Sequence, residues 1–191
     1  MRAMDCRVFV GSLVDASLRA DAIVNASNPE VALGTGVSGA IREACGGAPY
    51  QRLVRSAWEE EFDEPLGPDD CLVTTAGTAS AFRWVLHVAA VDYRKPDPET
   101  GGPSGPTRIE RCTRAALDAA EELAMSESAE SFVLGLPLLG AGHGGAGETA
   151  SAGAMVRALR GWAGPTRQVS TVVFAVLEEP TARIVRAALG L

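Results

Sequence analysis

Short apolar runs alternate with segments of helical periodicity along the whole chain. The apolar runs are rich in Val, Leu, Ile and Ala and nearly continuous, as expected for strands that are covered on both faces. They lie at Arg7–Gly11, Ala22–Asn25, Cys71–Ala76, Trp84–Val91, Phe132–Leu136 and Thr171–Leu177. The pattern therefore predicts a sheet built from these segments.

Between these runs, apolar residues recur every three or four positions, which indicates amphipathic helices. The recurring residues are Val37, Ala40, Ile41 and Ala44; Tyr50, Leu53, Val54 and Ala57; Ile109, Cys112, Ala116, Leu117 and Ala120; Ala152, Met155, Val156 and Leu159; and Ala182, Val185, Ala188 and Leu189. Gly46-Gly47 is expected to end the first helix, and Pro49 suits the first turn of the second.

The order of the elements predicts the class of fold. Because helices separate the strands, the sheet should be largely parallel, with helices on both faces of an α/β protein. The third helix is expected from about Thr107 to Met125. The stretch from Asp92 to Pro106 is irregular and rich in Pro and Gly, which predicts a surface loop rather than a linker between domains.

Length and composition narrow the choices further. The chain has 191 residues, which favours a single domain spanning residues 1–191. Its net charge is -7, and no basic cluster relieves that acidity, which argues against a nucleic acid as partner. A local anion site remains compatible with this charge, because backbone amides do not contribute to it.

The cysteines and histidines argue against a metal site. No two cysteines have C-x-x-C spacing; they are Cys6, Cys45, Cys71 and Cys112. With only His87 and His143 besides them, we expect neither a zinc site nor another cofactor. The thiols are typical of a reducing compartment, and no signal-peptide segment or membrane-length apolar run is present. A soluble cytoplasmic protein is the prediction.

Two Gly-rich loops each follow a strand-like run and open a helix-like run. The first runs from Asp21–Asn28 into Gly34–Ile41, and the second from Phe132–Leu139 into Gly140–Gly145. Glycines let backbone N–H groups approach an anion closely, and a helix N-terminus adds partial positive charge. Two such loops together predict a clamp for a diphosphate.

Several side chains near these loops could carry chemistry. Asn25 is assigned a structural role, stabilising the loop, whereas Asn28 is expected to reach the crevice and bond a sugar hydroxyl. Ser38 could cap the helix or bond a phosphate oxygen. His143 is a candidate proton donor, although its backbone N–H as a phosphate donor is the favoured interpretation. His87 is expected to be a satisfied core or strand-end histidine.

These residues resemble the macrodomain family. The resemblance rests on Asp21–Asn28, Gly34–Ile41, Trp84–Ala90 and Gly135–Gly145, in an order that covers almost the whole chain. It implies a three-layer α/β/α sandwich with a mixed, largely parallel central sheet. Members of the family typically bind ADP-ribose, and some remove it from proteins or from O-acetyl-ADP-ribose.

The resemblance assigns a ligand-binding role to residues from both loops and from the ends of the first and last predicted strands. Asn28 resembles the asparagine that contacts the distal ribose. The remaining candidates are Thr35, Gly36, Val37 and Ser38 in the first diphosphate loop, Gly140, Ala141, Gly142, His143 and Gly144 in the second, and Ser12, Leu13 and Val176 around adenine.

Four of these positions depart from the family pattern. Ser12 stands where an aspartate commonly reads the adenine amino group, and Ser38 stands where one hydrolase branch carries an acidic residue. The first loop also has no lysine, which a second branch uses as a nucleophile. Gly144 and Val176 stand where aromatic side chains often pack on the distal ribose and stack on adenine. Each missing aromatic is worth roughly 1 kcal/mol or more.

Three hypotheses about function follow. The first is binding of ADP-ribose, a related ADP-ribosyl metabolite or a modified protein. The second is an ADP-ribosyl hydrolase, acting by de-ADP-ribosylation or O-acetyl-ADP-ribose deacetylation, with water activated by the ligand's phosphate and His143 as helper. The third is a degenerate macrodomain that serves as an interaction module. A dinucleotide oxidoreductase is disfavoured because Gly11 stands alone after the first strand. The oligomeric state is left open.

Overall fold

The computed structural model describes residues 4–162 and 168–191, and every strand and helix predicted from the sequence is present in it. The strands are β1 (Asp5–Val10), β2 (Ala22–Ala26), β3 (Cys71–Thr75), β4 (Trp84–Val88), β5 (Phe132–Leu136) and β6 (Val169–Val176). The helices are α1 (Gly36–Ala44), α2 (Ala48–Glu61), α3 (Pro106–Ser126), α4 (Glu148–Gly161) and α5 (Glu179–Leu189), with a 3₁₀ turn at Ala16–Leu18.

The strands form one mixed, mostly parallel sheet in the order β1-β6-β5-β2-β4-β3. Every neighbouring pair is parallel except β3 and β4, which are antiparallel. This strand pair has no crossover helix between its members, because only residues 76–83 connect them. The predicted strand Trp84–Val91 was too long at its end, since β4 stops at Val88 and the Ala90 N–H donates to the Val88 carbonyl.

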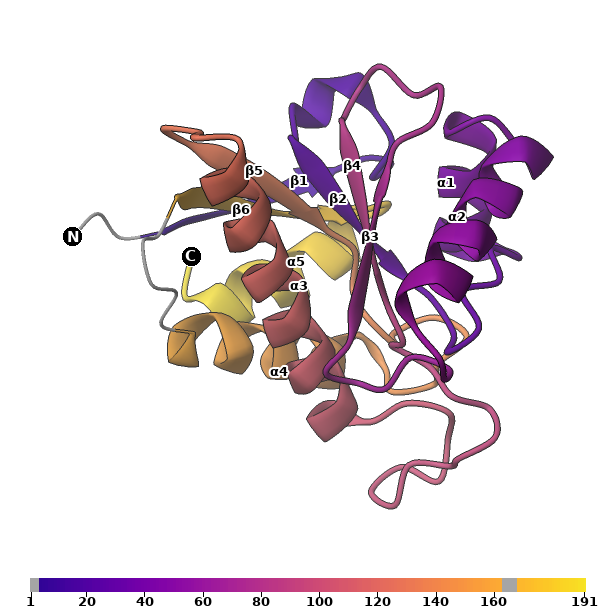
Figure 1. Ribbon diagram of the computed structural model, residues 1–191. Coiled ribbons are helices and arrows are strands. Elements are labelled where there is room, and N and C mark those ends of the chain that lie inside the picture. The colour runs from indigo at the N-terminus through magenta and orange to yellow at the C-terminus, as the bar shows by residue number, and fades with distance from the viewer. Residues whose placement is uncertain (1–3, 163–167) are drawn as a thin grey trace.

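Helices cover both faces of the sheet and make three layers. Figure 1 shows α1 and α2 on one side of the sheet and α3, α4 and α5 on the other. The alternation of side chains along each strand divides the core accordingly. In β2, Ala22 and Val24 pack in the cluster with α3 and α4, and Ile23 packs in the cluster with α1 and α2. Among the described helices, none is both long and apolar enough to cross a bilayer.

The helix boundaries follow from local chemistry. Gly46 and Gly47 have φ values of +120° and +69° directly after α1, which ends that helix where the sequence predicted. Pro49 lies in the first turn of α2, where the missing N–H costs nothing. The long helix α3 begins at Pro106 for the same reason.

The topology brings the two Gly-rich loops to one edge of the sheet. β2 and β5 are parallel neighbours, and residues 27–35 and 137–147 continue from their carboxyl ends. The first connection leads to α1 on one face, and the second leads to α4 on the other. Connections that leave neighbouring strands toward opposite faces open a crevice between them, which is the usual ligand position in such sheets.

Candidate functional site

Two adjoining cavities lie at the carboxyl ends of the strands. The first has a volume of about 310 Å³ and includes Asn28, Ser38 and His143 in its wall. The second has a volume of about 430 Å³ and includes Ser12 and Val176. Both cavities are lined by Gly36, Val37, Pro137, Leu138 and Gly142. The Gly-rich loops therefore form the boundary between the two cavities.

The first loop presents the uncapped N-terminus of α1 to the cavities. Thr35 occupies the N-cap position in an extended conformation, and its side chain makes no capping hydrogen bond. Gly36 has a φ of +60°, a conformation that glycine adopts without strain. The first intrahelical bond runs from the Gly39 N–H to the Thr35 carbonyl, at 3.2 Å. The N–H groups that precede it are thus available to an anion.

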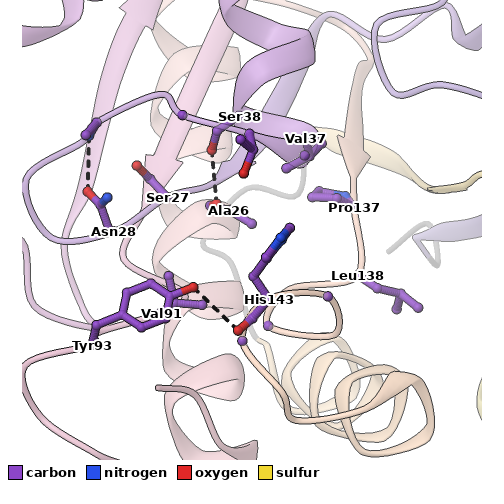
Figure 2. Close-up of a pocket in the computed structure, with 17 residues that line it drawn as sticks. Ala26, Ser27, Asn28, Val37, Ser38, Val91, Tyr93, Pro137, Leu138 and His143 are labelled. Carbon is purple, nitrogen blue, oxygen red and sulfur yellow. Dashed lines mark hydrogen bonds between the residues drawn. The ribbon is translucent and has the colours of Figure 1, made fainter. Parts of the chain in front are cut away.

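The second loop is held by its own backbone. The Ala146 N–H donates to the Gly140 carbonyl at 3.1 Å, and the Gly145 N–H donates to the Gly142 carbonyl at 3.0 Å. A Cβ placed on Gly36 would lie 4.0 Å from Nδ1 of His143, so the two loops face each other. Figure 2 shows the His143 side chain projecting from the second loop into the first cavity, on the side of Val37 and Ser38.

Gly144 occupies a position in the loop that has no room for a side chain. It is buried, and a Cβ built there would lie 2.5 Å from the carbonyl oxygen of Gly140. Real Cβ atoms do not approach backbone oxygens so closely. The aromatic residue that macrodomains often carry at this position is therefore incompatible with the path of this loop.

An aromatic side chain reaches the first cavity from a different segment. Tyr93, in the long loop between β4 and α3, lines this cavity with 63% of its surface exposed. Its hydroxyl donates to the His143 carbonyl at 3.4 Å, and Figure 2 shows this contact at the cavity edge. Tyr93 was not predicted as a site residue from the sequence. A long irregular loop that contains a single aromatic residue is the sequence signal that could have indicated Tyr93.

Two further polar side chains line the first cavity. The Asn28 Oδ1 accepts a hydrogen bond from the Ala32 N–H at 3.1 Å, which fixes the amide and leaves Nδ2 as its donor. Ser27 is buried, and its Oγ has no hydrogen-bond partner among the described residues. Ser27 was not predicted as a site residue either, because its burial without a partner is a property of the tertiary structure.

The Ser38 side chain does not cap α1, which was one of its two predicted roles. The N-cap of α1 is Thr35, and the Ser38 hydroxyl donates to the Asn25 Oδ1 at 2.7 Å. Its proton is thus used inside the protein rather than offered to a phosphate. Asn25 is structural, as expected, but it lies within β2 and bonds Ser38 and His87 instead of its own loop. Burial lowers the pKa of His87 to about 3, so this core imidazole is neutral.

The second cavity is more apolar and carries carboxylates at its edge. Leu13 and Val176 are almost fully buried, whereas the neighbouring Leu177 is 76% exposed. Leu177 is thus the more exposed apolar side chain at this cavity. The Ser12 Oγ accepts a long hydrogen bond of 3.4 Å from the Val14 N–H. Ala141 lines this cavity only, unlike the other predicted members of the second loop.

The charges around the site set limits on its chemistry. No Lys, Arg, Asp or Glu is among the described residues that line the first cavity. Glu148 and Glu178 lie at the second cavity, and the Thr181 hydroxyl donates to Glu148 at 2.7 Å. No group of three His, Cys, Asp or Glu side chains in residues 4–162 and 168–191 is arranged to hold a metal ion. With no Lys or Arg among the described residues that line either cavity, an anion would have to be bound by backbone amides and by side-chain donors such as Asn28 and Thr35.

Comparison with known proteins identifies the class. Residues 24–155 match the family described as Macro domain, and the chain belongs to this family. It is 30% identical over 158 residues to an uncharacterized protein of Aquifex aeolicus (strain VF5), covering 82% of each chain.

Solved structures with the same fold include two macrodomains. One is a mutant of the Oceanobacillus iheyensis macrodomain with ADPR, which has a TM-score of 0.76 and 19% identity, covering 96% of this chain and 90% of that one. The other is the Trypanosoma brucei macrodomain in complex with ADP-ribose, which has a TM-score of 0.68 and 21% identity, covering 97% and 69%.

Proposed function

We propose that this protein binds ADP-ribose, or an ADP-ribosyl group on another molecule, in the two adjoining cavities. The main observation in support of this proposal is that two Gly-rich loops face each other at the boundary between the cavities. A diphosphate at this boundary would accept hydrogen bonds from the backbone of both loops. The adenosine would then occupy the second cavity and the distal ribose the first.

The composition of each cavity supports this orientation. The second cavity is the larger, and it offers the apolar surfaces of Leu13, Val176 and Leu177 to a flat base. Ser12 would accept a hydrogen bond from the adenine amino group. The first cavity offers Asn28 and Tyr93, an amide donor and an aromatic face, which suit a sugar.

Binding is favoured over hydrolysis by the side chains of the first cavity. No carboxylate among the described residues lines it, so the general base would have to be His143 or the ligand's own phosphate. His143 is the single titratable imidazole in its wall. Loss of ADP-ribosyl ester turnover in His143→Ala, with unchanged ADP-ribose affinity, would support the hydrolase hypothesis.

Calorimetric titration tests the proposal directly. We expect ADP-ribose to bind in the micromolar range. ADP should bind more weakly because it lacks the distal ribose that contacts the first cavity, and AMP should bind most weakly because it also lacks one phosphate that contacts the loops. A folded protein that binds none of the three would contradict the proposal. That outcome would favour an interaction module that keeps the fold without the nucleotide site.

A substitution at Gly142 tests the role of the second loop. Gly142 is exposed, and a Cβ placed on it meets nothing within 4 Å, so a side chain there is compatible with the fold. We expect Gly142→Glu to weaken ADP-ribose binding about 100-fold or more, because its carboxylate would meet the diphosphate. Gly142→Ala is the matched control and should bind within a few-fold of the unsubstituted protein. Equal affinities of the two variants would remove this loop from the site.

A further inference from the structure

A chain of hydrogen-bonded side chains leads from the first cavity into the core beneath α1 and α2. The Ser38 Oγ lies 2.7 Å from the Asn25 Oδ1, and the Asn25 Nδ2 lies 3.0 Å from the His87 Nδ1. The His87 Nε2 lies 3.0 Å from the Thr74 Oγ1, which lies 3.0 Å from the Tyr50 hydroxyl. All five side chains are 6% exposed or less, so solvent does not compete for these bonds.

The strand register brings these residues together. Asn25 in β2 and His87 in β4 are directly paired in parallel strands, so their side chains lie on the same face. Thr74 in β3 lies on that face as well, and α1 and α2 place Ser38 and Tyr50 over it. The sequence separation between Asn25 and His87 is 62 residues, so only the fold creates this contact.

The chemistry of the groups gives the chain one direction. An amide oxygen only accepts and an amide nitrogen only donates, so Ser38 donates to Asn25 and Asn25 donates to the His87 Nδ1. That nitrogen must therefore be unprotonated, and the neutral imidazole carries its proton on Nε2, facing Thr74. The Ala26 carbonyl, 3.2 Å from the Ser38 Oγ, also accepts only. Either acceptor engages the Ser38 proton in a hydrogen bond within the protein.

The lone pairs of the Ser38 hydroxyl determine which group of a ligand can bind next to it in the first cavity. A hydroxyl whose proton is engaged inside the protein acts toward a ligand as an acceptor. Phosphate oxygens are acceptors too and gain nothing from such a group, whereas a sugar hydroxyl can donate to it. Ser38 lines the first cavity but not the second, so this preference acts beyond the diphosphate boundary.

We propose that Ser38 is a specificity-determining residue, held as a hydrogen-bond acceptor by the positioning residues Asn25 and His87. In this arrangement, the first cavity selects a hydroxyl-bearing arm of a nucleoside diphosphate over a further phosphate group. The inference rests on the proposed function for the identity of the ligand. The direction of the hydrogen-bond chain is a property of the free protein and is tested without ligand.

Nuclear magnetic resonance of the ¹⁵N-labelled, ligand-free protein at neutral pH tests the direction. The two imidazoles are distinguished by the spectrum of His143→Ala, since His87 and His143 are the histidines of the chain. We expect the His87 proton on Nε2, and a proton on Nδ1 would overturn the proposal. In Asn25→Asp, a carboxylate that can only accept should move the His87 proton to Nδ1 or protonate the ring.

Calorimetric titration with ADP-ribose, ADP and ATP tests the selection. ATP carries its third phosphate where ADP-ribose carries its distal ribose, so the ratio of their affinities reports the preference of the first cavity. Ser38→Ala should lower ADP-ribose affinity about 3- to 10-fold and leave ADP affinity nearly unchanged. An unchanged ratio of ADP-ribose to ATP affinity in Ser38→Ala would overturn the assignment of Ser38.

Two substitutions of His87 separate positioning from a merely structural role. His87→Asn keeps an acceptor near the position of Nδ1 and should preserve the ratio of ADP-ribose to ATP affinity. His87→Leu removes that acceptor and lets the Asn25 amide turn. It should therefore lower the ratio of ADP-ribose to ATP affinity, as Ser38→Ala does. Equal ratios in both His87 variants would count against the positioning role.

If the unsubstituted protein binds none of the three nucleotides, the proposed function fails, and the imidazole spectrum still decides the direction of the hydrogen-bond chain.

Discussion

At the scale of single residues, Ser27 combines burial with an unused hydrogen-bonding group. Its backbone is fully engaged, with the N–H donating to Val88 at 2.9 Å and the carbonyl accepting from Val91 at 3.3 Å. Ser27 lines the first cavity, and its hydroxyl is buried without a partner among the described residues. Such a group costs roughly 1–3 kcal/mol of stability, which is acceptable where a bound molecule satisfies it.

Ser27→Ala should therefore separate stability from binding. We expect the free energy of unfolding of the ligand-free protein to rise by about 1 kcal/mol, because an unpaired buried hydroxyl is removed. ADP-ribose affinity should fall about 3- to 10-fold. Urea unfolding and calorimetry measure the two effects.

Ser104→Ala is the matched control for this experiment. Ser104 is also buried, but its hydroxyl donates to the Ala90 carbonyl at 2.7 Å. Its removal should lower the free energy of unfolding by about 1 kcal/mol. If Ser27→Ala destabilised the free protein as Ser104→Ala does, Ser27 would have a structural partner instead of a role toward the ligand.

At the scale of elements, the loop between β4 and α3 is anchored at one residue and exposed at the next. The Asp92 N–H donates to the Pro103 carbonyl at 2.7 Å, and Arg94 donates to the Asp92 carboxylate at 3.1 Å. Against the effect of burial, hydrogen bonds from the Arg94 side chain and backbone N–H hold the pKa of Asp92 below its ordinary value. They place the exposed Tyr93 at the first cavity.

Tyr93→Ala tests whether this loop contributes to binding. We expect ADP-ribose affinity to fall about 5- to 10-fold through the lost aromatic contact, while AMP, which does not reach the first cavity, is unaffected. Tyr93→Phe keeps the ring and loses only the long bond to the His143 carbonyl, so its affinity should change little. Equal loss for ADP-ribose and AMP would indicate a general disturbance of the fold. Calorimetry with both ligands gives the answer.

At the scale of the whole molecule, the core on the α1 and α2 side carries a titratable group that must stay neutral. His87 is fully buried, and its pKa of about 3 lies below the ordinary value of 6.5. Between these values the unfolded chain binds a proton that the folded chain does not. The free energy of unfolding therefore decreases as the pH falls below 6.5, and above 6.5 the protonation of His87 does not affect it.

The free energy of unfolding should accordingly decrease with falling pH from about 6.5 toward 4. The contribution of His87 approaches about 1.4 kcal/mol per pH unit. His87→Asn should lack this contribution, so the difference in stability between the two proteins should change across that interval. The stability that Asp69 and Asp92 contribute, through pKa values lowered by arginine partners, is lost only at more acidic pH, around and below their ordinary pKa of 3.8. Urea unfolding at several pH values checks this, and parallel curves for the two proteins would contradict it.

The predictions from local pattern held for the strands, the helices and the parallel arrangement. Such features depend on residues close in sequence: apolar runs, helical periodicity, and glycine or proline at element ends. Pro49 and Gly46-Gly47 are examples, because each acts on its own backbone. The predicted extension of the strand Trp84–Val91 failed because its apolar pattern continues after the hydrogen bonds of β4 have ended.

The sequence by itself thus determined the α/β class and the two Gly-rich loops, each placed after a strand. Only the tertiary structure decided which side chains meet at the site. It paired Asn25 with His87, turned the Ser38 proton inward, excluded a side chain at Gly144 and brought Tyr93 to the cavity. Each of these depends on strand register or on the approach of distant segments, and residues far apart in sequence carry no local pattern that specifies such contacts.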